Sequence, residues 1–292
     1  MTKTRKLGDA EVFPIGLGGM PMSLSSRPPE ERAIRTIHAA LDAGVNFIDT
    51  ADAYSADDKD FGHNERLIAK ALKDRRDGVI IATKGGHTRT ADGGWELDGR
   101  PEYVKRACEA SLKALETDRI DLYQYHRPDP NVPYAESIGA LKELQDEGKI
   151  RWIGISNADT DQIEEARSIT ELVSVQNQLS LEYPSPVTKG EVALCEQHGI
   201  AFLPWSPLGG IANASDAAGN HNPVKDAAQA HGVSPQQVAL AWLLALSPVM
   251  IPIPGASRPE TITDSLKAVD LELSQEELDA VSEAAGLAPQ RA

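Results

Sequence analysis

The sequence predicts an α/β fold, a (β/α)8 barrel of the TIM type, and three observations support this. Eight short apolar segments alternate with stretches of helical periodicity along the 292 residues, and such alternation favours a parallel sheet covered by helices. Glycines follow several helical stretches, as left-handed helix termini require. Polar residues follow the apolar segments at the ends where parallel barrels hold their active sites. The length suits one such unit, so we expect residues 1–292 to form a single barrel domain.

Eight strands are predicted from the apolar segments, which are residues 14–18, 47–51, 79–84, 121–126, 152–156, 174–179, 201–206 and 250–255. Helical patterns are expected at residues 30–43, 64–73, 101–115, 134–147, 161–168, 186–198, 235–246, 259–268 and 275–285. The third pattern is the clearest, because its apolar and small residues recur at helical spacing and predict a face packed on the sheet. These residues are Val104, Ala107, Cys108, Ser111, Leu112 and Leu115.

Three segments lie outside this regular alternation. Residues 1–13 are typical of a short β-hairpin that turns at Gly8-Asp9 and would close the bottom of the barrel. Residues 85–100 and 207–224 are predicted to be long loops after the third and seventh strands. Loops of this length in a compact domain usually serve function.

An open doubly wound sheet is the main alternative fold. Such a sheet usually carries a glycine-rich phosphate turn after its first strand, and Gly16-Leu17-Gly18-Gly19 stands near that place. However, Pro21, Pro28 and Pro29 separate it from the first helical pattern, so the GxGxxG motif is not met. This interruption favours the barrel.

Composition limits the possible partners. The net charge of −15, from 44 acidic and 29 basic residues, disfavours binding to nucleic acid or to anionic membranes. The two cysteines, Cys108 and Cys195, lack metal-ligand spacing and are expected to be reduced. No stretch approaches about 18 consecutive apolar residues, and the opening residues lack the apolar core of a signal peptide. We therefore expect a cytoplasmic enzyme without nucleic-acid or membrane partners.

Four polar residues at predicted strand ends indicate a chemistry. Asp49, Tyr54, Lys84 and His126 all lie at or just beyond the carboxyl ends of strands, which face one mouth in a barrel. A tyrosine with an ordinary pKa of about 10 is a weak acid at neutral pH, and a neighbouring lysine ammonium would lower that pKa. Asp49 can keep Lys84 protonated, and His126 can donate a hydrogen bond to a reacting oxygen. Together they predict a proton-transfer site built on Tyr54.

Each of these residues taken alone also has a structural interpretation. A buried Asp–Lys pair is often purely structural, and a single histidine is more often a satisfied core residue. A metal-dependent barrel enzyme would need several His, Asp or Glu ligands at strand ends. Only Asp49 and His126 stand there, whereas His63 and His87 fall in loops, so we expect no metal.

At this point the sequence resembles the aldo-keto reductase family. The resemblance covers nearly the whole chain and rests on GLGGM, AGVNFIDTADAY, ATKGG, DRIDLYQYHRPDP, GKIRWIGISN, VQNQLS, PWSPLGG and IPIPGAS in this order. It implies an oxidoreductase that reduces aldehydes and ketones with NADPH, without metal or flavin, in the manner of an alcohol dehydrogenase or carbonyl reductase. The family's Asp–Tyr–Lys–His tetrad corresponds to Asp49, Tyr54, Lys84 and His126, with Tyr54 as the general acid.

The resemblance also assigns cofactor-binding positions, which are Ser156, Asn157, Gln176, Trp205, Ser206, Pro207, Leu208, Gly210, Gly255, Ser257 and Arg258. The first three would bind the nicotinamide carboxamide, Trp205 would stack on the nicotinamide, and the next four would follow the pyrophosphate. The last three belong to a loop that holds the 2′-phosphate, where Arg258 is the one cation. NADPH is therefore the expected cofactor, with NADH possible. Trp205 could instead be a core aromatic, and Arg258 a solvated charge.

The predicted substrate pocket contains Met20, Trp95, Tyr125 and Arg127, and the expected partner is a small-molecule carbonyl compound. Arg127 follows the catalytic histidine and could attract an acidic substrate, or equally form a salt bridge with Asp129. An alternative function is an NADPH-binding regulatory or redox-sensing subunit with little turnover. For the quaternary structure we expect a monomer or a weak homo-oligomer.

Overall fold

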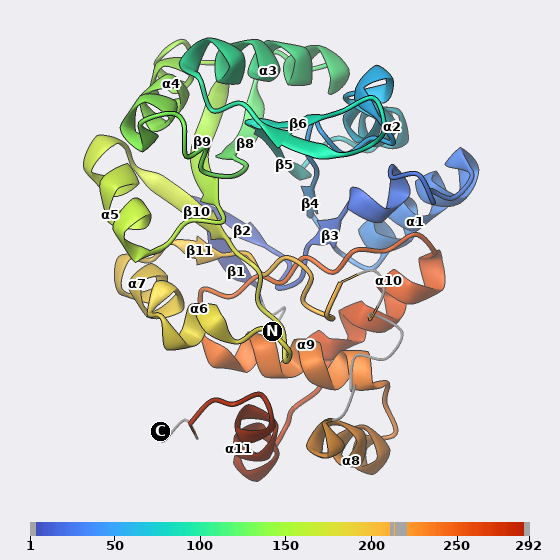
Figure 1. Ribbon diagram of the computed structural model, residues 1–292. Helices are drawn as coiled ribbons and strands as arrows, with labels where there is room; N and C mark the ends of the chain where they lie inside the picture. The colour runs from blue at the N-terminus through green and yellow to red at the C-terminus, as the bar shows by residue number, and fades with distance from the viewer. Residues whose placement is uncertain (1–3, 211–212, 214–220, 289–292) are drawn as a thin grey trace.

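Seven parallel strands form one curled sheet in the order β11-β10-β9-β8-β5-β4-β3, surrounded by helices (Figure 1). The computed structural model describes residues 4–210, 213 and 221–288. The strands are β3 (Leu17–Gly18), β4 (Phe47–Asp49), β5 (Ile80–Gly85), β8 (Ile120–Tyr125), β9 (Ile150–Ser156), β10 (Leu172–Gln176) and β11 (Ala201–Phe202). Because they are parallel, their carboxyl ends share one edge of the sheet.

The predicted eighth segment, residues 250–255, bonds to both edges of this sheet. The amide of Ile251 donates to the carbonyl of Phe202 in β11 at 2.8 Å, and the amide of Gly18 in β3 donates to the carbonyl of Pro254 at 3.0 Å. The segment makes isolated bridges rather than a regular strand. Its two prolines lack N–H donors, which explains the interrupted ladder.

Helices cover the outside of the sheet (Figure 1). They are α1 (Glu30–Asp42), α2 (His63–Ala71), α3 (Pro101–Ala114), α4 (Tyr134–Asp146), α5 (Thr160–Ile169), α6 (Ser185–Thr188), α7 (Glu191–His198), α8 (Asn222–His231), α9 (Pro235–Leu246), α10 (Pro259–Leu266) and α11 (Gln275–Ala284), with short 3-10 turns at Met20–Met22, Asp58–Asp60 and Lys267–Asp270. The main core lies between helices and sheet, and a second cluster fills the inside of the curled sheet. The helical pattern predicted around Cys108 forms α3, with Val104, Cys108 and Leu112 buried.

An antiparallel pair at the start of the chain lies at the bottom of the sheet. β1 (Arg5–Leu7) pairs with β2 (Ala10–Val12), turning at Gly8 with φ +59°. Leu7 and Val12 pack into the inner cluster. The hairpin therefore lies at the end of the sheet opposite to the carboxyl ends of its strands.

Besides the eighth predicted strand, the structure differs from the predicted elements in three further places. Residues 85–100 contain an antiparallel hairpin, β6 (His87–Arg89) with β7 (Trp95–Leu97), which the polar sequence concealed. The helix expected at 186–198 is divided into α6 and α7, because Gly190 adopts φ +89°. The predicted loop 207–224 is described only at 207–210, 213 and 221–224, and α8, which was not predicted, begins at Asn222.

Candidate active site

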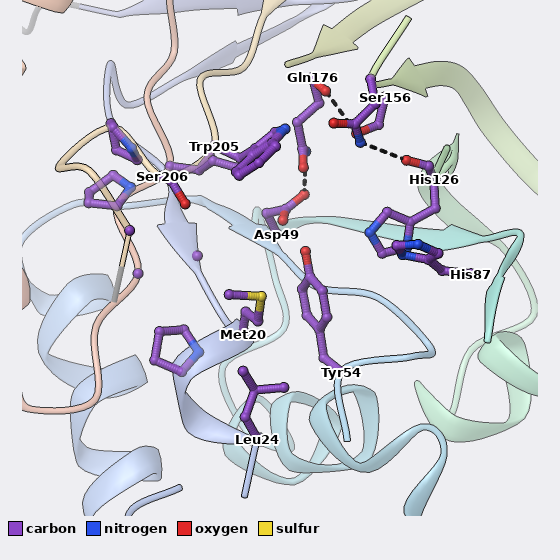
Figure 2. Close-up of a pocket in the computed structure, with 18 of the residues that line it drawn as sticks. Met20, Leu24, Asp49, Tyr54, His87, His126, Ser156, Gln176, Trp205 and Ser206 are labelled. Atoms are coloured by element: carbon purple, nitrogen blue, oxygen red, sulfur yellow. Dashed lines mark hydrogen bonds between the residues drawn. The ribbon is translucent and has the colours of Figure 1, made fainter. Parts of the chain in front are cut away.

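The four predicted catalytic residues converge at the carboxyl edge of the sheet. Asp49 ends β4, Lys84 lies near the end of β5, and His126 follows β8 directly, while Tyr54 stands in the turn after β4. Figure 2 shows the Tyr54 hydroxyl pointing toward Asp49, with the ring of His126 to one side and Trp205 to the other. Because the carboxyl ends of parallel strands share one edge of the sheet, these side chains meet in one site.

Lys84 is the centre of the hydrogen-bond network. Its side chain is fully buried, and its Nζ donates to Asp49 Oδ1 at 2.6 Å, to the Thr50 carbonyl at 2.7 Å and to the Tyr54 hydroxyl at 3.1 Å. An ammonium group has three donors, so every donor of Lys84 has an acceptor. The charge is therefore both paired and held beside the tyrosine oxygen.

The second oxygen of Asp49 is also bound. Gln176 Nε2 on β10 donates to Asp49 Oδ2 at 2.7 Å, and Gln124 Nε2 on β8 donates to the same oxygen at 3.3 Å. The Gln124 amide is held in turn by Ser174 Oγ, which donates to its Oε1 at 3.1 Å. Sequence reasoning assigned Gln176 to the nicotinamide and missed Gln124. The signal that could have identified Gln124 is a polar glutamine within an apolar segment predicted to be a buried strand.

The local charges set the protonation of Lys84 and Tyr54. Burial pulls the pKa of Lys84 down, but the Asp49 carboxylate and the Tyr54 oxygen raise it, and the net pKa lies above the ordinary value. Burial also raises the pKa of Tyr54, and the Lys84 ammonium works against that rise without overcoming it. The expected net lowering of the Tyr54 pKa was therefore wrong. Tyr54 is held as a neutral hydroxyl, ready to donate.

His126 is a neutral imidazole. Burial lowers its pKa well below the usual value, and the Lys84 ammonium adds to this effect. The ring lies edge-on to that of Tyr54, with the centroids 5.8 Å apart. A neutral imidazole carries one N–H and can donate a hydrogen bond to an oxygen held near Tyr54.

A pocket of about 530 Å³ opens above these side chains. The predicted residues that line it are Met20, Asp49, Tyr54, Trp95, His126, Arg127, Ser156, Asn157, Gln176, Trp205, Ser206, Pro207, Leu208, Gly210 and Gly255. Gly18, Pro21, Leu24, His87, Ile253 and Pro254 also line it and were not predicted. Lys84 lies beneath the pocket floor, bonded to Tyr54. Ser257 and Arg258, which were also predicted to bind the cofactor, are not among the lining residues, and they directly precede α10.

Asn157 ties three strand ends together. It adopts a left-handed backbone conformation with φ +58°, and its Nδ2 donates to the His126 carbonyl and to Ser156 Oγ, both at 3.0 Å. Its Oδ1 accepts from Arg127 Nη2 at 3.1 Å, and Ser156 Oγ donates to the Gln176 carbonyl at 2.7 Å. Residues predicted to bind the carboxamide therefore also fix the backbone around His126.

The segment after β11 presents backbone to the pocket. Ser206 has φ +50°, and Gly209 and Gly210 have φ +80° and +88°. Such positive φ values turn successive peptide groups, and small residues allow close approach of a ligand. Trp205 precedes this turn and lines the pocket with its indole.

Tyr125 lies outside the pocket, contrary to the sequence prediction. It is 1% exposed, and its hydroxyl accepts a hydrogen bond from the Asp129 amide at 3.0 Å. Side chains alternate along a strand, so Gln124 faces inward and Tyr125 faces the helices. The prediction overlooked this alternation, which the strand pattern contained.

The β6–β7 hairpin places His87 beside His126. The two ring centroids are 4.5 Å apart, and His87 lies 5.1 Å from the Trp95 ring (Figure 2 shows the two histidines). The Arg89 guanidinium covers Trp95 at 3.9 Å. Burial lowers the pKa of His87 to about 4, with Arg127 the next cause. This residue was missed because the hairpin was predicted to be a loop.

Two further acids are buried near the site. Asp52 is 1% exposed, and burial followed by repulsion from Glu65 raises its pKa well above the usual value. Glu65 accepts a hydrogen bond from Thr83 Oγ1 at 2.6 Å, and burial raises its pKa. Within residues 4–210, 213 and 221–288, no group of three His, Cys, Asp or Glu side chains is arranged to hold a metal ion. In the same residues, no helix has the length and apolar character of a membrane span.

Fold and site together define a class: α/β proteins with a curled parallel sheet whose mouth holds a buried Asp–Lys–Tyr cluster and a neutral histidine. The sequence model of the Aldo/keto reductase family matches residues 14–285. The chain belongs to this family.

Relatives of known sequence and structure agree with this assignment. The chain is 37% identical to an uncharacterized oxidoreductase of Schizosaccharomyces pombe, over 94% of this chain and 87% of the relative. It is 34% identical to a probable aldo-keto reductase of Glycine max, over 94% of this chain and 86% of that relative. A crystal structure of an aldo-keto reductase from Klebsiella pneumoniae in complex with NADPH superimposes with a TM-score of 0.83 and 27% sequence identity. The match covers 100% of this chain and 97% of that chain.

Proposed function

We propose that this protein reduces aldehydes and ketones to alcohols with NADPH, with Tyr54 delivering the proton. The observation that carries the proposal is the Lys84 ammonium, bonded to both Asp49 and the Tyr54 hydroxyl beneath the pocket. Membership of the family and the NADPH complex of the Klebsiella relative support the cofactor and the oxidoreductase class. The reaction class follows from pairing a neutral acid with a hydride donor.

The residues of the pocket fit a nicotinamide dinucleotide. Trp205 offers a flat face, and Gly210 and Gly255 line the cavity without a side chain that would obstruct a phosphate chain. Arg258 is exposed at the amino terminus of α10, where a helix favours an anion. We assign Ser257 and Arg258 to the 2′-phosphate, so NADH should bind more weakly. When bound, the cofactor supplies the hydride.

The chain's own residues manage the proton. His126 donates a hydrogen bond to the carbonyl oxygen of the substrate and orients it toward the Tyr54 hydroxyl. Tyr54 transfers its proton to that oxygen, and the Lys84 ammonium stabilises the phenolate that forms. Asp49 keeps the ammonium protonated, and the two glutamine amides hold Asp49 in place. In alcohol oxidation, the same phenolate would act as the base.

We also infer the complete architecture as a closed (β/α)8 barrel in one domain spanning residues 1–292. Hydrogen bonds from residues 249–255 to both sheet edges support closure. The inner cluster beneath the mouth supports a filled barrel interior, as in other barrels of this kind.

The test of the function is loss of NADPH absorbance with 4-nitrobenzaldehyde, compared between wild type and Tyr54→Phe. We expect turnover in wild type and its collapse in the variant. Quenching of tryptophan fluorescence by NADPH, without turnover for a panel of aldehydes, would favour the regulatory subunit. Absence of both turnover and binding would refute the proposal.

A further inference from the structure

Arg127 is a half-buried cation in the wall of the pocket without a counter-ion. Its guanidinium makes a 3.1 Å hydrogen bond to the amide oxygen of Asn157, and burial lowers its pKa. No carboxylate in the described part of the chain forms an ion pair with it. Asp129, the obvious candidate from the sequence, instead accepts the amides of Gly99 at 3.0 Å and Asn131 at 2.9 Å.

On the pocket side, Arg127 faces no unpaired carboxylate among the lining residues, although the chain carries a net charge of −15. The one carboxylate that lines the pocket, Asp49, is already paired with Lys84 at 2.6 Å. The pKa of His87 falls to about 4, first through burial and then through Arg127 and Arg89. The same cations that disfavour a protonated histidine favour an anion at this wall.

We propose that the carbonyl substrate also bears a carboxylate, and that Arg127 binds this group. The proposal rests on the reductase function proposed above and names its substrate class. A guanidinium has five donors in a planar fork that matches a carboxylate, and only one hydrogen bond to protein is present. Because His126 and Arg127 line the same pocket, one small molecule can present its carbonyl to His126 and its carboxylate to Arg127.

Pocket size limits this molecule further. The cavity of about 530 Å³ must hold the nicotinamide end of the cofactor as well as the substrate. Apolar side chains such as Met20 and Leu24 also line the pocket (Figure 2). The substrate class is therefore an aldehyde or keto acid with a short apolar or aromatic body, rather than a large sugar phosphate.

A second cavity of about 270 Å³ shares Arg127, Asn157 and Trp205 with the pocket. It also contains Lys189, but it includes the acidic residues Asp159 and Glu191. Those carboxylates make this side less favourable for an anion. Arg127 therefore serves an anion from the pocket side, and Lys189→Met should leave acid recognition unchanged.

The experiment compares 4-formylbenzoate with its methyl ester, which has the same reacting aldehyde but no charge. For each variant, kcat/KM for the acid is divided by kcat/KM for the ester. In this acid-to-ester ratio, effects of the substitution on cofactor binding and on the chemical step cancel. We expect Arg127→Met to lower this ratio at least tenfold, mainly through KM, and Arg127→Lys to lower it less. Arg119→Met is the matched control, because this exposed arginine stands at the opposite end of β8 and should leave the ratio unchanged.

Two further readouts do not require the variants to turn over substrate. In wild type, raising the salt concentration should lower the acid-to-ester ratio, because a half-exposed ion pair is screened. Calorimetric titration of benzoate should show at least tenfold weaker binding to Arg127→Met than to Arg119→Met, independently of turnover. An unchanged ratio and equal benzoate affinity would overturn the inference. Failure of wild type to reduce either aldehyde would instead refute the reductase, while the benzoate result would still decide the anion site.

Discussion

The two sides of the pocket are built on different principles. On the proton-transfer side, Lys84 and Asp49 are buried and make five hydrogen bonds or ion-pair contacts between them and their neighbours. On the side proposed to bind the cofactor, the segment after β11 offers turned backbone, and Arg258 stands exposed at a helix end. The first side fixes its charges before any ligand arrives, as electrostatic preorganisation requires. The second leaves its polar groups available, so cofactor preference can change without altering the chemistry.

The largest effect on the proton-transfer side is expected when the proposed general acid, Tyr54, is removed. Tyr54→Phe should lower kcat by about 10²- to 10⁴-fold, the usual contribution of a positioned general acid, while NADPH binding persists. Stopped assays of NADPH oxidation and fluorescence quenching measure the two quantities. Tyr134→Phe is the matched control, because the Tyr134 hydroxyl is buried without a partner among the described residues. Comparable losses in both variants would argue against a special role for Tyr54.

Next in size is the structural cost of breaking the buried pair. Lys84→Met leaves the Asp49 carboxylate uncompensated and should lower the free energy of unfolding by about 3–5 kcal/mol. Urea denaturation measures this change. Adding Asp49→Asn to the variant should restore part of the stability, because the amide needs no counter-ion. A double variant that is less stable than the single one would show that the pair is not the source of the loss.

A smaller effect is expected on the open side of the pocket. Arg258→Gln should weaken kcat/KM for NADPH by about 10- to 100-fold, the range for hydrogen bonds to charged groups of about 1.5–3 kcal/mol, and leave NADH unaffected. Steady-state kinetics with both cofactors measures the ratio, and Arg258→Lys should retain part of the preference. Equal losses with NADH would place Arg258 outside the phosphate site.

The smallest change concerns the buried acid Asp52 and depends on pH. Its folded pKa lies well above the unfolded value, so the neutral form is buried and wild type loses stability as the pH rises above that unfolded value. Asp52→Asn removes this pH dependence. The free energy of unfolding of the variant should therefore rise relative to that of wild type by up to about 1.4 kcal/mol per pH unit, as long as Asp52 stays protonated in folded wild type. Chemical denaturation of both proteins at pH 5 and pH 6 tests the sign. A constant difference would mean that Asp52 is ionised in the folded protein.

The sequence predicted the strand ends better than the loops between them. Asp49, Lys84 and His126 could be placed together because parallel strands align their carboxyl ends, whatever the details of packing. Trp95 was predicted to line the pocket and does so, but His87 was missed, because polar residues in a glycine-rich stretch conceal the β6–β7 hairpin. The sequence pattern also could not show which side chains form hydrogen bonds with one another in the site. Gln176 bonds to Asp49 through an inward position that only the assembled sheet brings within 2.7 Å.

Closure of the sheet depends on a segment that is poor in donors. Residues 250–255 include two prolines, and the segment donates to the β11 side through the amides of Ile251 and Ile253. Gly18, Ile253, Pro254 and Gly255, from both sides of this seam, also line the pocket. A ligand seated there would contact both edges of the sheet at once. Occupancy of the pocket should therefore raise the melting temperature of the whole molecule and slow amide exchange at the seam, by ordinary binding linkage.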